Sequence, residues 1–284
     1  MISVTALKNT FFEPFDGPAI VDAKFLKWKS DPSSKYHDII NEVLQSSDDA
    51  LCKKAILKLW MFKGNRSVYR GKVLHKLIEN CLNQLPEHVN KQIIDEAETA
   101  TSAARVCGGS NDSVFSELVD AEDCAAARKF IVSFMGGGMG GVKETPPYVC
   151  VRNEYFAFSQ WMKRHSDTVR LYKAEWKIRS EKLNLVGVVD AVFEYIDSPG
   201  ELLIVDWKRN AKIDMENPVE KMGLRAPFDV LPDCNFGHYS MQLNVYARMI
   251  ESLPDVNLKV RKMLIVQIAG SSGIANEFNV KRLF

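Results

Sequence analysis

The stretch Leu183–Lys208, LNLVGVVDAVFEYIDSPGELLIVDWK, predicts two neighbouring β-strands joined by a turn at Asp197–Gly200. Apolar and β-branched residues fill both halves, and the DSPG sequence between them favours a turn. Successive side chains of a strand point to opposite faces, so Asp206 and Lys208 project from one face, about 6.6 Å apart at ~3.3 Å per residue. The stretch therefore predicts a β-hairpin that carries a carboxylate and an ammonium at the end of its second strand.

Asp190 lies in the first strand among apolar residues, where an unpaired carboxylate is costly to bury. Two carboxylates and an ammonium at the ends of adjacent strands can bind a hard divalent cation and position a water beside it. A plain strand-end ion pair between Asp206 and Lys208 is the simpler alternative. An exposed Asp190 on a half-solvated sheet face is equally compatible with this stretch alone.

The composition is that of a globular protein, with 284 residues of which 46% are hydrophobic and 26% charged. A net charge of +1 provides no global field to recruit nucleic acid, so any attraction for phosphate must come from local patches. The longest apolar runs fall short of the ~18–20 residues of a membrane span, and the N-terminus has no secretory pattern. We therefore expect an intracellular protein without membrane association. Six cysteines without a C-x-x-C pair indicate reduced thiols.

Helical and strand periodicities outside the hairpin predict an α/β fold with a mixed sheet. We expect four segments: an N-terminal helical region over 1–65 with a helix break at Gly64-Asn65, a first core helix over 66–84, an insertion over 85–147 that ends in the Gly-rich linker MGGGMGGVKETPP, and a core over 148–284. Within the core, the pattern predicts a helix over 153–165, a strand over 172–178, the hairpin, a loop over 209–236, a helix over 237–253, a buried strand over 261–268 and an edge strand over 275–284.

Further polar residues of interest lie on these elements. Glu175 lies on the strand before the hairpin, and Gln242 and Tyr246 are four apart on the later helix, hence on one side of it. His75 follows Gly71 on the first core helix. Each has a plain structural explanation, because a helix-surface histidine or a core tyrosine is common.

Taken in order, these residues form the pattern R-G-x-x-x-H, then E, G-x-x-D, D-x-K and Q-x-x-x-Y, over about residues 66–84 and 150–268. This pattern resembles the PD-(D/E)XK nuclease superfamily. It is most similar to the RecB-like branch, which includes phage recombination exonucleases and mitochondrial genome-maintenance exonucleases. The motif positions are Gly71, His75, Glu175, Gly187, Asp190, Asp206, Lys208, Gln242 and Tyr246. Val189 stands where the superfamily name has proline.

The resemblance implies a restriction-endonuclease-like core, a central mixed sheet flanked by helices, and Mg²⁺ or Mn²⁺ as cofactor. It implies that Asp190, Asp206, His75 and the backbone carbonyl of Trp207 bind the metal. Glu175 would bind a second metal, directly or through water, or position Lys208. Lys208 would orient or deprotonate the attacking water. Gln242 and Tyr246 would hold the geometry of the site. Some relatives carry an iron–sulfur cluster on C-terminal cysteines, but Cys234 is the only cysteine after Cys150, so none is expected.

A basic stretch precedes His75. Between Leu51 and Ile78 there are eight basic residues and no acidic one. With the interleaved aromatics Trp60, Phe62 and Tyr69, they could bind phosphates and stack on bases, although a solvated helix face is the alternative. We predict that nucleic acid contacts Lys53, Lys54, Lys58, Lys63, Arg66, Tyr69, Arg70, Lys72 and Lys76.

These observations predict a metal-dependent DNA exonuclease of replication, repair or recombination that acts on single strands or duplex ends. Proteins of those processes would be its partners. A flap or junction endonuclease on the same site is the first alternative. A catalytically silent nucleic-acid-binding scaffold is the second, although such degenerate relatives usually lose one of the residues equivalent to Asp190, Asp206 and Lys208.

Overall fold

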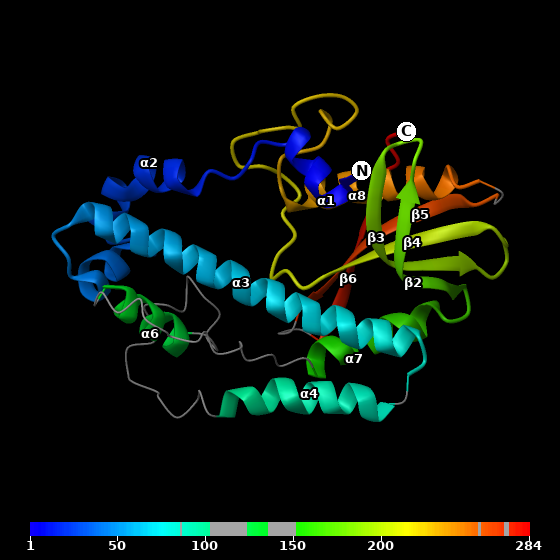
Figure 1. Cartoon of the computed structure of the whole chain (residues 1–284), viewed down its shortest axis with the longest axis horizontal. Coiled ribbons are helices and arrows are strands. Elements are labelled where there is room, and N and C mark those ends of the chain that lie inside the picture. The colour runs from blue at the N-terminus through cyan, green and yellow to red at the C-terminus, as the bar shows by residue number, and fades with distance from the viewer. Residues whose placement is uncertain (86, 103–123, 136–151, 255–256, 270–272) are drawn as a thin grey trace. The chain divides into compact units, whose positions relative to one another are not determined.

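The computed structural model describes residues 1–85, 87–102, 124–135, 152–254, 257–269 and 273–284 (Figure 1). The chain divides into two compact units. The first, here called the sheet unit, comprises Met1–Pro14, Leu74–Lys91 and Val151–Phe284. The second, the helical unit, comprises Phe15–Val73 and Gln92–Cys150. The Gly-rich linker predicted within 85–147 lies outside the described residues.

The sheet unit contains a six-stranded mixed sheet. Its strands are β1 (Ile2–Ser3), β2 (Val169–Ser180), β3 (Leu185–Tyr195), β4 (Glu201–Lys208), β5 (Lys259–Ala269) and β6 (Ile274–Asn279). The order is β1-β3-β4-β5-β6, and β2 also pairs with β3. The β1–β3 and β4–β5 pairs are parallel and the others antiparallel. The predicted α/β class with a mixed sheet is confirmed.

Each face of the sheet packs on its own helices, because strands β4 and β5 are apolar on both faces. Helix α8 (Asn235–Glu251) covers one face, where Ile204 and Ile265 belong to its core. Helix α7 (Arg152–His165) covers the other with the C-terminal turns of α3 (Asp49–Leu82), and there Trp161 and Trp207 cross edge to face. We call these the α8 core and the α7 core. In Figure 1, strands β2 to β6 are coloured from green through yellow to red.

The helical unit is built from α2 (Gly17–Ser30), the π-helix η2 (Ile39–Leu44), the first part of α3, α6 (Cys124–Met135) and most of α4 (Glu87–Ser102). Its core surrounds Phe25, Ile39 and Phe62. The N-terminal elements α1 (Val4–Leu7) and the 3₁₀ turn η1 (Lys8–Thr10) belong to the sheet unit.

The predicted helix break at Gly64-Asn65 is wrong, because α3 runs without interruption from Asp49 to Leu82. A glycine inside a helix costs only about 1 kcal/mol relative to alanine. Burial of Phe62 and of the Arg66 side chain, which stacks on its ring at 4.8 Å, overrides so small a propensity. Strand β1, which pairs with β3, was not predicted from the sequence.

The loop between β4 and α8 contains no helix or strand over residues 209–234, all of which are described. One isolated bridge joins Met222 to Pro232. Cys52, Cys81 and Cys234 are free thiols. None of the helices in the described ranges is long and apolar enough to cross a membrane.

Gly187 is required by a close approach between β3 and α8. A Cβ atom at this position would lie 2.5 Å from Cε1 of Tyr246, whose ring is buried. We expect Gly187→Ala to lower the free energy of unfolding by about 1–3 kcal/mol through overpacking. Chemical denaturation measures this. Gly71→Ala is the matched control, because a Cβ atom added to Gly71 would have no described neighbour within 4 Å and alanine is the better helix former. Equal stability of the two variants would contradict the assignment.

Glu251 joins the end of α8 to β5 and the C-terminus. It accepts hydrogen bonds from the Val260 amide and from Arg282. Partial burial raises the pKa of Glu251, but the bonds from Arg282 and Val260 outweigh it and hold the pKa below its ordinary value. The stabilisation is therefore present above the unfolded pKa of about 4.3 and is lost as the pH falls through the lower folded pKa. We expect Glu251→Gln to cost about 1–2 kcal/mol at pH 7 and less at pH 3, as measured by urea unfolding.

Candidate active site

Strands β3 and β4 part at Asp190. They pair from Glu194/Leu202 to Ala191/Val205, where their pairing stops. Beyond that point β4 continues to Lys208 beside β5, and β3 continues beside β2. The Asp190 side chain lies at this fork, and its Oδ2 accepts a hydrogen bond from the amide of Trp207 at 2.9 Å. The Asp190 carboxylate thus accepts the hydrogen bond of the Trp207 amide, which lies beyond the part of β4 that pairs with β3.

Glu175 lies on β2 across from Asp190 and has a left-handed backbone, with φ +44°. A non-glycine residue pays about 1–2 kcal/mol for this conformation, and such strain gathers at functional sites. The twist also reverses which face β2 presents. Ala174 packs against the α7 core, whereas Trp176, two residues on, packs against the α8 core. The strain therefore turns the Glu175 carboxylate toward the fork.

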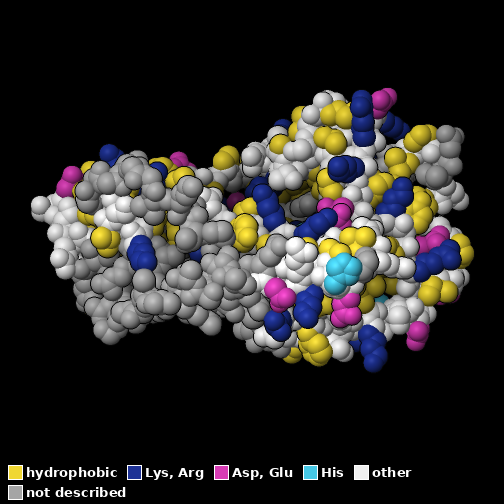
Figure 2. Space-filling model, turned by 60° about the horizontal axis from the view of Figure 1, so that its bottom comes forward, with side chains coloured by type: hydrophobic (Ala, Val, Ile, Leu, Met, Phe, Trp, Pro, Cys, Tyr) yellow, Lys and Arg dark blue, Asp and Glu magenta, His cyan; other side chains and the backbone are white. Residues whose placement is uncertain are grey.

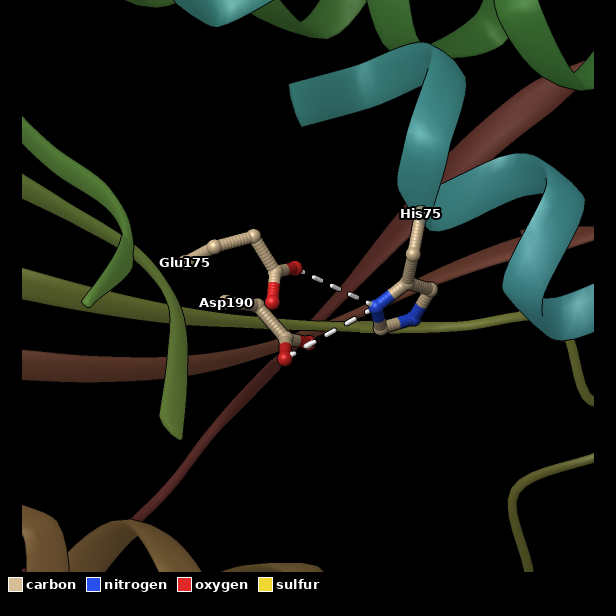
Figure 3. A group of neighbouring side chains, drawn as sticks. All are labelled: His75, Glu175 and Asp190. Carbon is tan, nitrogen blue, oxygen red and sulfur yellow. Dashed lines mark ion pairs between the residues drawn. The ribbon is translucent and has the colours of Figure 1, made fainter. Parts of the chain in front are cut away.

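His75 of α3 completes a group of three potential ligands (Figure 3). One ligand atom from each of His75, Glu175 and Asp190 lies within 4.8 Å of the others. The His75 Nδ1 atom is 3.8 Å from Glu175 Oε1 and 3.7 Å from Asp190 Oδ1. Its Nε2 lies 3.0 Å from the carbonyl oxygen of Trp207. A carbonyl can only accept, so Nε2 carries a proton in this contact, and Nδ1 faces the carboxylates.

The electrostatics of the group suit a cation. Burial lowers the pKa of His75, but the carboxylates of Asp190 and Glu175 outweigh it and raise this pKa to about 9. An imidazolium therefore occupies the space between the two acids at neutral pH. A divalent ion with the same ligands would supply the same compensation.

Asp206 and Lys208 form an ion pair beside this group. Lys208 Nζ is 2.7 Å from Asp206 Oδ2, and the Asp206 side chain is buried. Burial raises the pKa of Asp206 to about 6 against the opposing effect of Lys208. Burial lowers the pKa of Lys208, but Asp206 and Asp190 outweigh it and hold the lysine in its charged form. The predicted common face of Asp206 and Lys208 is confirmed. Asp206 lies outside the three-residue ligand group.

Gln242 and Tyr246 lie on the face of α8 turned to the sheet. Gln242 Nε2 donates to the Tyr246 hydroxyl at 3.2 Å, and the ring packs on Gly187. Burial raises the pKa of Tyr246 to about 12, so the hydroxyl stays protonated. The pair joins α8 to the strand that carries Asp190.

Sequence reasoning missed three residues that adjoin this site. Tyr239 lies beneath Lys208, whose Nζ is 4.7 Å from the centroid of the tyrosine ring. Tyr239 is spaced from Gln242 and Tyr246 so that it falls on the same side of the helix, and this spacing could have identified it from the sequence. Arg209 follows Lys208 and binds Glu154 of α7, a carboxylate with no exposed surface, at 2.8 Å. Nothing in the sequence pattern joins Glu154 to Arg209.

The basic stretch of α3 is only partly available to a ligand. Arg66 and Arg70 are buried, and Phe62 and Trp60 pack inside the helical unit, so these aromatic rings are not base-stacking surfaces. Two lysines have acidic partners, Lys53 with Asp22 and Lys76 with Glu79. The remaining predicted contacts are exposed or half-buried: Lys54, Lys58, Lys63, Tyr69 and Lys72.

No protein-family model matches the chain, and a search of curated proteins gave no match. The assignment of a function therefore depends on the geometry of these residues.

The contact between Lys208 and Tyr239 predicts a ring-current effect. The ε-methylene protons of Lys208 should resonate upfield of those of lysines without a ring contact, in wild type and in Tyr239→Phe, which keeps the ring. They should return to the common range in Tyr239→Leu, which also loses the cation–π energy of about 0.5–2 kcal/mol. Proton–carbon correlation spectra with ε-labelled lysine measure this. An upfield Lys208 signal that persists in the leucine variant would refute the stacking.

Proposed function

We propose that the chain is a metal-dependent nuclease of the PD-(D/E)XK superfamily, RecB-like branch, that hydrolyses DNA phosphodiester bonds. The supporting observation is the juxtaposition at the fork between β3 and β4. There, three potential metal ligands from three elements lie beside a buried aspartate–lysine pair. A strand-end ion pair alone does not explain the strained Glu175 or the histidine from α3.

The donor set fits Mg²⁺ or Mn²⁺. Two carboxylates and one imidazole nitrogen suit Mn²⁺ in particular, and carboxylates suit Mg²⁺. His75, Glu175 and Asp190 would hold the ion. Asp206 lies next to them and would neutralise it further. When bound, the ion would polarise the scissile phosphate and lower the pKa of a coordinated water.

The protein groups have separate roles in this proposal. Lys208, charged and fixed by Asp206 and the Tyr239 ring, would stabilise the negative charge of the pentavalent phosphate. The Trp207 carbonyl would orient His75 through Nε2, and the Trp207 amide would orient Asp190. Gln242 and Tyr246 would fix α8 against the fork.

An exonuclease that uses single strands or duplex ends is the form of the activity that we propose. End-labelled single-stranded, duplex, flap and closed circular DNA, each with Mg²⁺ or Mn²⁺, would test it. Shortening from an end with intact circles is the expected result. Cleavage of closed circular DNA would contradict the exonuclease proposal and support the endonuclease alternative. Binding without cleavage in either metal would favour the catalytically silent scaffold.

Removal of the central groups should abolish cleavage and leave binding. We expect Asp190→Asn, Asp206→Ala and Lys208→Ala each to lower the cleavage rate at least a hundredfold. The aspartates would hold or neutralise the ion, Lys208 would stabilise the charge on the reacting phosphate, and one such electrostatic group contributes about 10²–10³ in rate. Asp197→Ala is the control, because this exposed acid lies in the β3–β4 turn of the same unit. Cleavage by the Asp206 variant in Mg²⁺, unaffected by EDTA, would disprove the mechanism.

A further inference from the structure

We propose that an exposed row of four residues on β2 and β3 binds the backbone of a nucleic-acid strand and directs it to the fork. The row consists of Lys177, Arg179, Val186 and Val188. The inference rests on the proposed nuclease function and identifies a substrate surface outside the metal ligands. None of the four residues belongs to the basic stretch of α3.

The four side chains share one face of the sheet. Lys177 pairs with Val188 and Arg179 with Val186 in the antiparallel ladder, and opposed residues point to the same face. Leu185 and Val189, which flank Val186 and Val188 on β3, pack into the α8 core, so the row points to the opposite face.

This part of the sheet face is open. Val186 and Val188 are each 38% exposed, although the valines and isoleucines of β4 and β5 on this sheet are buried. The row therefore forms an apolar floor on β3 with a cationic border on the edge strand β2.

The row ends at the acids of the fork. One further step along the ladder places Glu175 beyond Lys177 and Asp190 beyond Val188. Alternate residues of a strand are about 6.6 Å apart, a spacing comparable to that of consecutive phosphates in an extended nucleotide chain. Phosphates on Arg179 and Lys177 would thus be followed by a phosphate at the fork.

The two cations are free to bind phosphate. Lys177 has no ion pair within the described parts of the chain. Arg179 contacts Glu181 at 3.3 Å, but both side chains are mostly exposed, and such pairs contribute about 0–1 kcal/mol. Acidic and basic side chains are interspersed over the face drawn in Figure 2. Local rows must therefore supply phosphate contacts, because a net charge of +1 cannot.

Charges on an edge strand also prevent edge-to-edge aggregation, which is the competing explanation. That role would be served by any charge on β2. The same strand supplies a comparison, because Arg170 and Lys173 are also exposed and pair with Glu194 and Val192. Arg170 is neutralised by Glu194, and Lys173 lies over the Trp176 ring.

The test compares two double variants with the same loss of charge from β2. Lys177→Ala/Arg179→Ala removes the row cations, and Arg170→Ala/Lys173→Ala removes the comparison pair. Both are made in an Asp206→Ala background so that substrate is not consumed. Fluorescence anisotropy with a labelled single-stranded oligonucleotide, without added metal, gives Kd between 50 and 200 mM salt.

The row variant should bind at least tenfold more weakly at 50 mM salt. The slope of log Kd against log salt should fall by about 1.4, at ~0.7 per phosphate contact on a single strand. The comparison variant should keep the slope of its parent. Val188→Glu, which adds a carboxylate at an exposed position and removes no cation, should also weaken binding without lowering the melting temperature.

Equal slopes of log Kd against log salt for the two double variants would contradict the proposal that the row binds phosphates. The nuclease proposal would still stand if the wild-type chain cleaved DNA in the presence of metal and the Asp190→Asn variant did not. Absence of both binding and metal-dependent cleavage in the wild-type chain would overturn both proposals.

Discussion

The site depends on the point at which β3 and β4 stop pairing. A sheet that stayed closed would satisfy the Trp207 amide with a β3 carbonyl and would leave Asp190 on one face. Instead, the Asp190 carboxylate accepts that amide, so the main chain of β4 fixes the carboxylate in the gap. The carbonyl of the same residue lies 3.0 Å from His75 Nε2. One peptide segment of β4 thus orients two of the three potential ligands, and the third arrives through the left-handed backbone of Glu175.

The surrounding cores make this arrangement rigid. Trp207 packs edge to face on Trp161 and Phe158 from α7, which holds the β4 segment against the α7 core. On the other face, the buried Tyr246 ring packs so closely on Gly187 that no side chain fits between α8 and β3. The two strands of the fork are therefore clamped by different helices, and the fork can neither close nor open without repacking a core. Close-packed interiors resist such displacements, which is the physical basis of a preorganised site.

Much of the sheet unit could be predicted from sequence, because its helices and strands follow simple periodicities. The hairpin, the common face of Asp206 and Lys208, the doubly buried β5 and the α8 helix are confirmed. Strict alternation failed on both β2 and β3 beside the fork. It would put Ala174 and Trp176 on one face of β2 and Val189 and Ala191 on one face of β3. Instead, Ala174 and Ala191 pack against the α7 core, and Trp176 and Val189 pack against the α8 core. The parting of two strands and a positive φ at a glutamate are tertiary effects without a local signal. The same holds for the buried pair of Glu154 and Arg209, whose partners are far apart in the chain.

For the proposed nuclease, the charge balance of the fork explains why substrate contacts should lie outside it. Three carboxylates, Glu175, Asp190 and Asp206, are opposed by Lys208 and by the imidazolium of His75. Without a divalent ion the fork is net negative and repels phosphate. With the ion bound by a neutral imidazole, the charges of the carboxylates, the lysine and the ion cancel. An uncharged site does not itself attract a polyanion, so affinity must come from cations beside it. On β2, Lys177 and Arg179 are exposed cations on the face opposite the α8 core, and the direction in which a strand runs over them would decide which of its ends reaches the fork.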